Sequence, residues 1–348
     1  MSYPTQVLKA GENFAGCPGI RRAAESLRAG ELVAIPTETV YGLAANALDE
    51  QAVGRIFAVK GRPADNPLIV HISEMAELEK LTMRVPESAL RLAKRYWPGP
   101  LTMVLPSRED VVPSLTRAGL STVAVRMPAH PVARALIAAA GLPLAAPSAN
   151  LSGKPSPTTA AHCFADLNGL IPFILDGGPC GVGVESTVVD MTGETPRLLR
   201  PGAVTPEMIK DELGELILDP AIYSEPDPQS PVASPGMRHK HYAPKAKVAI
   251  LKGDWQSCKA FMALKKTQGA MALVFEEELS GCPLPALSLG PQAEPETHAR
   301  ALFACLRELD ERGAERVYAR CPQSDGMGLA VYNRLIRAAG FEEITVDS

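Results

Sequence analysis

The chain has 348 residues, which is long for a single hydrophobic core and predicts two domains. Hydrophobic residues make up 46% and charged residues 21%, a balance typical of globular proteins. The formal net charge of −4 argues against a protein held to nucleic acid mainly by phosphate neutralisation, because such binding needs many clustered lysines and arginines.

Membrane and secretory signals are not found in the sequence. No segment offers the roughly 18 uninterrupted apolar residues that a membrane helix needs, and the N-terminus has no basic stretch followed by an apolar run. The seven cysteines are scattered and form no Cys-x-x-Cys pair, which disfavours a disulfide framework and a zinc site. We therefore expect a cytoplasmic protein that does not contact a membrane.

The first two hundred or so residues mix helical and extended patterns. Ile20, Ala23, Ala24 and Leu27 have the spacing of a buried helix face, with Gly30 suited to its C-terminal end. Further helices are predicted around residues 53–57 and 132–140, and strands at 32–35, 68–72, 122–126, 142–146, 173–175 and 186–190. Such mixing predicts an α/β domain with a twisted sheet.

The pattern changes after the helix start at Thr205-Pro206. Six prolines lie between Pro220 and Pro244, too many for regular structure, so this stretch is interpreted as an extended, fairly stiff linker. Beyond it, strands are predicted at 248–251, 272–275 and 316–319, with a long helix striped by apolar residues from 299 to 309. We expect a domain at 1–215, a linker at 216–246, and a smaller α/β domain at 247–348.

The segment Pro36–Ala47 (PTETVYGLAANA) is the most unusual local stretch. It follows a buried strand directly, and loops at strand ends often carry ligand contacts in α/β proteins. Its alternative is a strand-to-helix turn with a capping threonine. Spacing alone favours neither interpretation.

Two cations follow at one helix end, Lys60 and Arg62, with Asn66 shortly after. Lys60 lies on the apolar stripe of its helix, where it could simply reach out to water or interact with the helix C-terminus. A second cation after Gly61 favours a site for a phosphate or carboxylate, which arginine can bind through two parallel hydrogen bonds.

Two strands each carry one unexpected polar residue. His71 lies in the apolar run LIVHI, where a hydrogen-bonded core histidine is more common than a ligand contact. In the strand STVAVRMP, Thr122 and Arg126 share one face by period-2 alternation. A half-buried arginine needs an anionic partner, which is either a carboxylate of the protein or a ligand.

Ala146–Thr158 is a loop of small residues that is dense in hydroxyl and amide groups. Ser148 and Asn150 would lie on one side of an extended segment, and Lys154 and Ser156 follow. Backbone N–H groups, hydroxyls and one lysine can cradle a phosphate, although the Gly-x-x-x-x-Gly-Lys-Ser/Thr spacing is absent. The alternative is a solvated loop with helix-capping serines.

Three further segments place polar groups beside apolar runs or prolines. They are Glu185-Ser186-Thr187-Val188, Leu199-Arg200-Pro201-Gly202 and the basic segment Ser234–Pro244 (SPGMRHKHYAP), which alone could be a soluble tether. Several separate segments that could each bind an anion, all in one domain, favour a functional site more strongly together than any one of them does alone.

Taken together, these motifs resemble the L-threonylcarbamoyl-AMP synthase family in its two-domain form, over nearly the whole chain. The motifs in order are PTETVYGL, KGRP with NPLIVHI, STVAVRMP, APSAN with SGKPSPT, ESTVVD, LLRPG and SPGMRHKHYAP. The resemblance implies a YrdC-like catalytic domain with a large cleft, the linker as a possible lid, and a Rossmann-like C-terminal domain that matches more loosely.

The resemblance also implies a reaction. L-threonine, bicarbonate or CO2 and ATP, with Mg²⁺, give threonylcarbamoyl-AMP and pyrophosphate, and the product serves threonylcarbamoyladenosine modification of tRNA. By motif, Lys60 and Arg62 are the catalytic residues, and Thr39, His71, Arg126 and Ser186 bind threonine. The implied ATP contacts are Arg62, Asn66, Thr122, Ser148, Asn150, Ser156, Arg200 and Tyr242. No protein metal ligand is implied, because ATP phosphates hold the Mg²⁺, and tRNA or a downstream threonylcarbamoyl transferase complex is a possible partner.

Two alternatives remain open at this point. One is a module that binds double-stranded RNA or tRNA, which the acidic net charge disfavours. The other is a carbamoyl-adenylate-forming step of hydrogenase maturation, which uses a related domain together with zinc-finger segments that this chain lacks.

Overall fold

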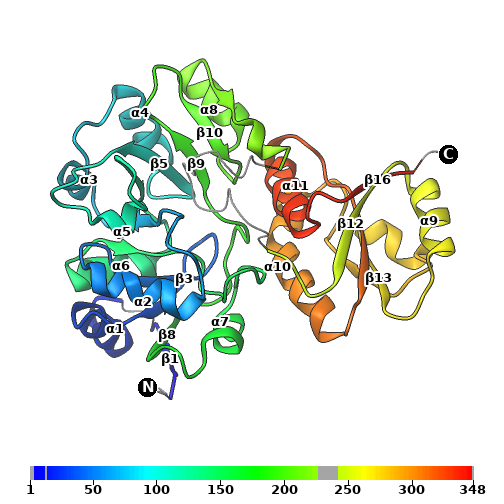
Figure 1. Cartoon of the computed structure of the whole chain (residues 1–348), viewed down its shortest axis with the longest axis horizontal. Coiled ribbons are helices and arrows are strands. Elements are labelled where there is room, and N and C mark those ends of the chain that lie inside the picture. The colour runs from blue at the N-terminus through cyan, green and yellow to red at the C-terminus, as the bar shows by residue number, and fades with distance from the viewer. Residues whose placement is uncertain (1–3, 12–13, 226–241, 347–348) are drawn as a thin grey trace.

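The computed structural model describes residues 4–11, 14–225 and 242–346, which form two domains built around separate sheets (Figure 1). An eleven-stranded mixed sheet has the order β1-β8-β2-β3-β7-β4-β6-β5-β9-β10-β11, and a five-stranded sheet has the order β14-β13-β15-β12-β16. The α/β class predicted for both parts of the chain is confirmed.

The large sheet is mixed because short turns join some of its strands and helical crossovers join others. For example, β2 and β3 pair antiparallel across a short turn, whereas β4 and β6 pair parallel. Its strands are β1 Gln6–Lys9, β2 Val33–Ile35, β3 Gly42–Asn46, β4 Ile69–His71, β5 Leu101–Pro106, β6 Thr122–Arg126, β7 Leu144–Ala145, β8 Phe173–Asp176, β9 Thr187–Asp190, β10 Arg197–Arg200 and β11 Ile217–Leu218.

The helices of the first domain bury apolar stripes against this sheet. The four residues predicted as the buried face of α1 are all at most 2% exposed. Helix α2 begins after the N-cap Asp49, which accepts two backbone N–H groups, and ends at Gly61 with φ +62°. The helices are α1 Pro18–Arg28, α2 Glu50–Lys60, α3 Met75–Leu81, α4 Glu87–Tyr96, α5 Ser114–Arg117, α6 Pro131–Ala140, α7 Ala160–Leu167 and α8 Pro206–Leu213, with 3₁₀ turns η1 Phe14–Gly16 and η2 Pro220–Ile222.

The second domain has an all-parallel sheet with helical connections, which agrees with the α/β class expected for this part of the chain. Its strands are β12 Lys247–Lys252, β13 Ala270–Val274, β14 Ala286–Ser288, β15 Arg316–Arg320 and β16 Glu343–Thr345. Its helices are α9 Trp255–Leu264, α10 Pro295–Glu311 and α11 Gly326–Ala338, with the 3₁₀ turn η3 Glu276–Gly281.

Helices α10 and α11 lie between the second sheet and the first domain (Figure 1). From α10, Arg307 reaches Asp166 of α7 at 2.7 Å, and from α11, Arg334 reaches Glu185 at 2.9 Å. One hydrophobic cluster includes buried residues of both domains. The two domains therefore share an extensive packed interface.

One open alternative is excluded and one local expectation needs correction. Pro36–Ala47 is not a strand-to-helix turn, because the chain turns back into the antiparallel strand β3. The first part of the predicted linker has regular structure, since β11 pairs with β10 and η2 follows it. Residues 226–241, which include most of SPGMRHKHYAP, lie outside the described residues.

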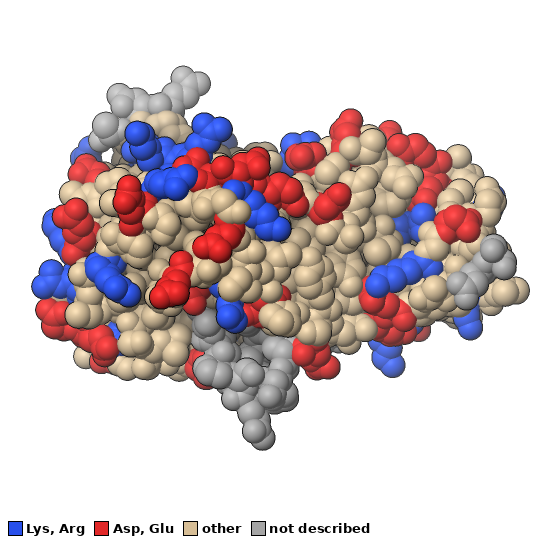
Figure 2. Space-filling view, turned by 90° about the horizontal axis from the view of Figure 1, so that it is seen from above, with Lys and Arg blue, Asp and Glu red and all other residues tan. Residues whose placement is uncertain are grey.

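The described residues contain no helix that is long and apolar enough to cross a membrane. All seven cysteines are free thiols. On the face in Figure 2, acidic and basic side chains are interspersed over both domains.

Candidate active site

A single pocket brings together segments that are far apart in the sequence. Its walls come from the turn after β2, the loop after α2, strand β4, the ends of β6 and β10, the loop after β7 and the start of β9. It encloses about 600 Å³ of space that atoms do not fill, open solvent at its mouth included. Eight of the predicted site residues line it: Thr39, Arg62, His71, Arg126, Ser148, Ser186, Arg200 and Tyr242.

The turn between β2 and β3 is held by a chain of hydroxyl groups. Thr37 Oγ1 donates to the carbonyl of Val40 at 2.6 Å and accepts the backbone N–H groups of Thr39 and Val40. Because that hydroxyl proton is used, the 2.8 Å contact between the two threonine hydroxyls has Thr39 as its donor. Gly42 lets this turn approach the loop after β7, since an added Cβ would lie 3.1 Å from Cβ of Ala146.

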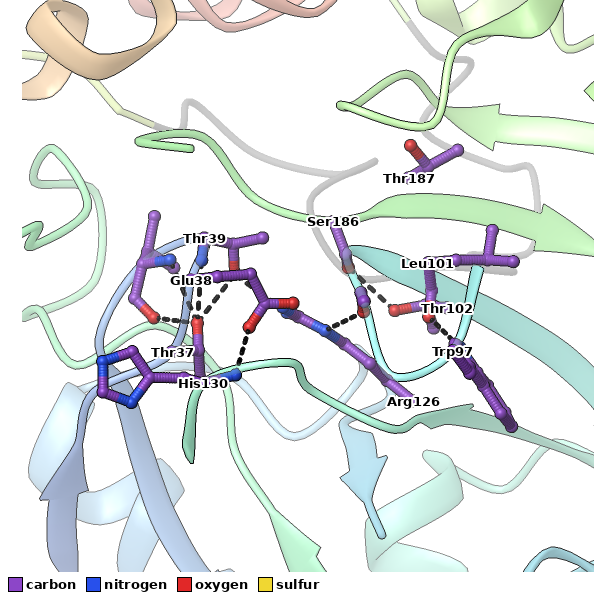
Figure 3. A network of polar contacts seen from close by, with 12 residues as sticks. Thr37, Glu38, Thr39, Trp97, Leu101, Thr102, Arg126, His130, Ser186 and Thr187 are labelled. Carbon is purple, nitrogen blue, oxygen red and sulfur yellow. Dashed lines mark hydrogen bonds and ion pairs between the residues drawn. The ribbon is translucent and has the colours of Figure 1, made fainter. Parts of the chain in front are cut away.

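Arg126 is held at the pocket wall by a protein carboxylate (Figure 3). Its Nη2 bonds Glu38 Oε1 at 2.6 Å, its Nη1 donates to Thr39 Oγ1 at 2.8 Å, and its Nε donates to the carbonyl of Gly99 at 3.3 Å. Burial alone would raise the pKa of Glu38, but the charge and hydrogen bond of Arg126 outweigh it and hold the pKa below its ordinary value. A guanidinium has five N–H groups, so two remain for a ligand.

Ser186 lies at the centre of a second network, of which Figure 3 shows the contact with Thr102. Its hydroxyl is 2.8 Å from Thr102 Oγ1 and accepts from Arg200 Nη2 at 3.1 Å, while Arg200 Nε donates to the Ser186 carbonyl at 3.0 Å. Burial lowers the pKa of Arg200 to about 10, which still leaves it charged at neutral pH. This network fixes a cation beside the segment that opens β9.

Arg62 and Asn66 carry buried polar atoms that have no partner among the described residues. These atoms are Nε of Arg62 and both Oδ1 and Nδ2 of Asn66. Buried polar groups nearly always form hydrogen bonds in folded proteins. Arg62 lines the pocket, so its unsatisfied donor fits an incoming anion.

Lys60 lies behind the pocket wall. It is 3% exposed, as its place on the apolar stripe predicts, and its Nζ donates to the carbonyls of Ser148 and Asn150 at 2.5 and 2.6 Å. Burial, with a smaller contribution from Arg62, lowers the pKa of Lys60 to about 7. The geometry makes it an anchor for the loop after β7, and its catalytic role stays a prediction.

Four further predicted residues do not line the pocket. Asn66 and Asn150 are buried, and the Asn150 Nδ2 donates to the carbonyls of Leu151 and Lys154. Ser156 is fully buried and donates to Glu185 Oε1. Thr122 begins β6, at the opposite end of the strand from Arg126. Lys154, expected in a phosphate cradle, instead pairs with Asp166 at 2.9 Å.

His71 lines the pocket although its sequence context favours a core residue. Its Nδ1 is 3.1 Å from the carbonyl of Ile69. Burial, and next the nearby charge of Arg126, lower the pKa of His71 to about 3. The imidazole is therefore neutral at physiological pH and adds no charge to the pocket.

Tyr242 joins the pocket to the second domain. It is 5% exposed, has φ +65°, and its ring lies 5.3 Å from that of Phe303 in α10. Residues 226–241 before it are not described, so the predicted lid stays a prediction.

Sequence reasoning missed the carboxylates that organise these cations. Glu38 and Glu185 both lie inside the motifs of the first domain, directly beside Thr39 and Ser186. A signal was present for both, because a buried arginine requires a counter-charge. The sequence offered no signal for Arg334, which bonds Glu185 from helix α11.

Chemically, the pocket combines one guanidinium already paired with a carboxylate, two further guanidinium groups, and several hydroxyls. This arrangement can bind a small carboxylate and a polyanion side by side. Among the described residues, no group of three or more His, Cys, Asp or Glu side chains could hold a metal ion.

Comparisons with known proteins cover both domains. Residues 25–202 match the family described as "Telomere recombination", and residues 204–340 match the family described as "Threonylcarbamoyl-AMP synthase, C-terminal domain". Threonylcarbamoyl-AMP synthase of Pyrococcus abyssi is 48% identical over 94% of this chain and 96% of its own length. The Bacillus subtilis enzyme of the same name is 47% identical over 93% of each chain.

A solved structure matches the whole fold. The crystal structure of Pyrococcus abyssi Sua5 complexed with L-threonine has a TM-score of 0.90 and 45% identity, and covers 99% of this chain and 100% of that chain. These whole-chain matches do not favour the alternative of an RNA-binding module.

Proposed function

The chain belongs to the threonylcarbamoyl-AMP synthase family, and from this we propose that its pocket binds L-threonine and ATP and joins them through CO2. The enzyme forms L-threonylcarbamoyl-AMP and pyrophosphate, as a nucleotidyltransferase. The observation that carries the proposal is the convergence of Arg62, Arg126 and Arg200, from three separate segments, on one pocket.

Threonine binds in the half of the pocket formed by Thr39, His71, Arg126 and Ser186. Arg126 has two N–H groups left for the substrate carboxylate, and its bonds to Glu38 and Thr39 fix its orientation before the substrate arrives. The neutral imidazole of His71 contacts the substrate without repelling its ammonium group. The similarity to Pyrococcus abyssi Sua5, which was crystallised in complex with L-threonine, supports this half of the proposal.

ATP binds on the side of Arg62, Ser148, Arg200 and Tyr242. The partnerless Nε of Arg62 supports a phosphate contact there, and the partnerless amide of Asn66 supports a further polar contact close by. Thr122, Asn150 and Ser156 do not line the pocket, and Ser156 contributes through Glu185.

The reaction needs positioning and charge neutralisation more than covalent catalysis. The threonine ammonium first gives one proton to water, and the neutral amine attacks CO2 to form a carbamic acid, which gives a second proton to water and becomes a carbamate. A carbamate oxygen then forms a bond to the α-phosphorus of ATP, and the bond to the β-phosphate oxygen breaks to release pyrophosphate. Arg62 and Arg200 hold the charge that develops on the phosphates, and Lys60 keeps the Ser148–Asn150 loop in place.

Mg²⁺ would be held mainly by the phosphate oxygens of ATP and not by carboxylates of this chain. The residues around the pocket fit this role, because the neighbouring carboxylates of Glu38 and Glu185 are both engaged by arginines. Hydroxyls such as that of Ser148 are the groups of this chain that would complete its coordination. When bound, the ion neutralises phosphate charge.

In the cell, the product supplies threonylcarbamoyladenosine modification of tRNA, through a transferase that takes up the mixed anhydride. The free thiols support a reducing compartment, the cytoplasm.

Pyrophosphate release tests the proposal. With ATP and Mg²⁺, release should require both L-threonine and bicarbonate, and threonylcarbamoyl-AMP should be detected by mass spectrometry. L-valine, which has the shape of threonine without its hydroxyl, serves as the control substrate. Release that is independent of threonine, or no release at all, would contradict the assignment.

A further inference from the structure

A buried arginine of the second domain lies inside the wall of the pocket. Arg334 in α11 is fully buried, and its Nε donates to Glu185 Oε2 at 2.9 Å. Its Nη2 donates to the Glu185 carbonyl at 3.0 Å, and its Nη1 to the Pro201 carbonyl at 2.5 Å. One guanidinium thus contacts two separate segments of the first domain.

Both of those segments carry residues that line the pocket. Glu185 itself lines it, and Ser186 and Arg200 are the immediate neighbours of Glu185 and Pro201. Glu185 also accepts a hydrogen bond from Ser156, at 2.5 Å from its other carboxylate oxygen. Through Glu185, the guanidinium of Arg334 is also linked to the loop after β7, so it connects three segments that each carry a residue lining the pocket.

Arg334 also balances a buried charge. Burial alone would raise the pKa of Glu185, but the charges of Arg334 and Arg200, with hydrogen bonds from Ser156 and Arg334, hold the pKa below its ordinary value. Glu185 is therefore ionised at neutral pH. Without Arg334, this carboxylate would face the pocket with much less compensation and would repel phosphates.

We propose that Arg334 is a positioning residue through which the C-terminal domain completes the ATP side of the pocket, by holding Glu185 against Ser156 and beside Arg200. The inference rests on the proposed function, because it assigns this side of the pocket to ATP. It gives the C-terminal domain a part in shaping the substrate pocket.

The test replaces Arg334 in the full chain and measures pyrophosphate release against ATP and threonine separately. For folded Arg334→Met we expect the KM for ATP to rise about tenfold, because an under-compensated carboxylate then faces a polyanion. The KM for threonine should change less than about threefold, since threonine enters as a zwitterion and the Arg126 guanidinium proposed to bind its carboxylate is compensated by Glu38, not by Glu185. Adding Glu185→Gln removes the charge and should recover part of the ATP affinity.

Arg320 provides a matched control. It forms a buried pair with Glu278 at 2.8 Å within the second domain, and it does not line the pocket. Arg320→Met removes an equivalent buried ion pair, so it should lower the unfolding midpoint and leave both KM values unchanged. Equal KM values for ATP in Arg334→Met and Arg320→Met would overturn the proposal.

If Arg334→Met does not fold, Arg334→Lys tests the positioning role instead. Lysine keeps the charge but cannot bond Glu185 and Pro201 through a planar fork. A KM for ATP raised about threefold supports the positioning role, and a wild-type KM overturns it. Failure of the wild-type chain to release pyrophosphate with threonine would instead remove the proposed function, so the two failures are distinguishable.

Discussion

Variants of the pair formed by Arg126 and Glu38 allow an effect on threonine binding to be distinguished from an effect on the unfolding free energy. Arg126→Met leaves the largely buried carboxylate of Glu38, whose side chain is 15% exposed, without its partner. Such a loss costs about 3 kcal/mol of unfolding free energy, at the low end for buried pairs because of that exposure. The same change removes the two N–H groups available to the substrate carboxylate, worth about 3 kcal/mol, or roughly 150-fold in the KM for threonine.

The double variant Arg126→Met with Glu38→Gln distinguishes the two effects. No buried charge is left unpaired, so the unfolding free energy measured in urea should return to within about 1–2 kcal/mol of the wild type. The KM for threonine, measured by pyrophosphate release at saturating ATP, should remain raised because the carboxylate partner is still missing. A double variant with the wild-type KM would refute the reasoning. Arg55→Met, which breaks the exposed pair with Glu31, should change stability by less than about 1 kcal/mol and is the control.

Three further outcomes follow from the same geometry. Burial lowers the pKa of His71 to about 3 and that of His162 to about 4, so only the unfolded chain binds these two protons between about pH 6.5 and 4. The unfolding free energy measured in urea titrations should therefore fall as the pH is lowered over this range, and it should fall less steeply in His71→Asn. An equal slope in the variant and the wild type would contradict the burial of His71. Lys60→Met should lower kcat/KM for ATP about tenfold, because two buried loop carbonyls lose their donor. The control Lys154→Met removes an ion pair with Asp166 away from the pocket, so its kcat/KM for ATP should stay near that of the wild type. Tyr242→Ala should raise the KM for ATP and lower the unfolding midpoint, since the ring both lines the pocket and packs on α10; unchanged ATP kinetics would remove Tyr242 from the nucleotide site.

Elements with a clear period could be predicted from the sequence. Strand β6 matches its predicted range of 122–126, and the stripe of α1 is buried as its spacing requires. Strand β3, with the sequence GLAAN, was missed because four of its five residues are buried, which removes the alternation that marks a half-buried strand. The turn before it was consequently open to a wrong interpretation as a helix start.

The site was predictable in its cations and not in their partners. Residue type and motif order indicated Arg62, Arg126 and Arg200, because a charged side chain at the border of an apolar run is rarely buried without a partner. Spacing along the chain could not identify partners that are 88 residues away, as Glu38 is from Arg126, or 149 residues away, as Glu185 is from Arg334. Lys60 illustrates the same limit, because its partners are backbone carbonyls, which every residue offers.

These pairings explain how one pocket can serve both an amino acid and a nucleotide in the proposed function. Glu38 compensates the charge of Arg126, so the threonine side presents a guanidinium with two available N–H groups and little excess positive charge. Glu185 is compensated mainly by Arg334 from outside the first domain, with a smaller contribution from Arg200, so in the proposed function more of the positive charge of Arg62 and Arg200 acts on the polyphosphate. An amino acid that carries one carboxylate needs the first arrangement, and a nucleotide that carries several negative charges needs the second. In the proposed function, the placement of Glu38 and Glu185 therefore favours threonine beside Arg126 and ATP beside Arg62 and Arg200.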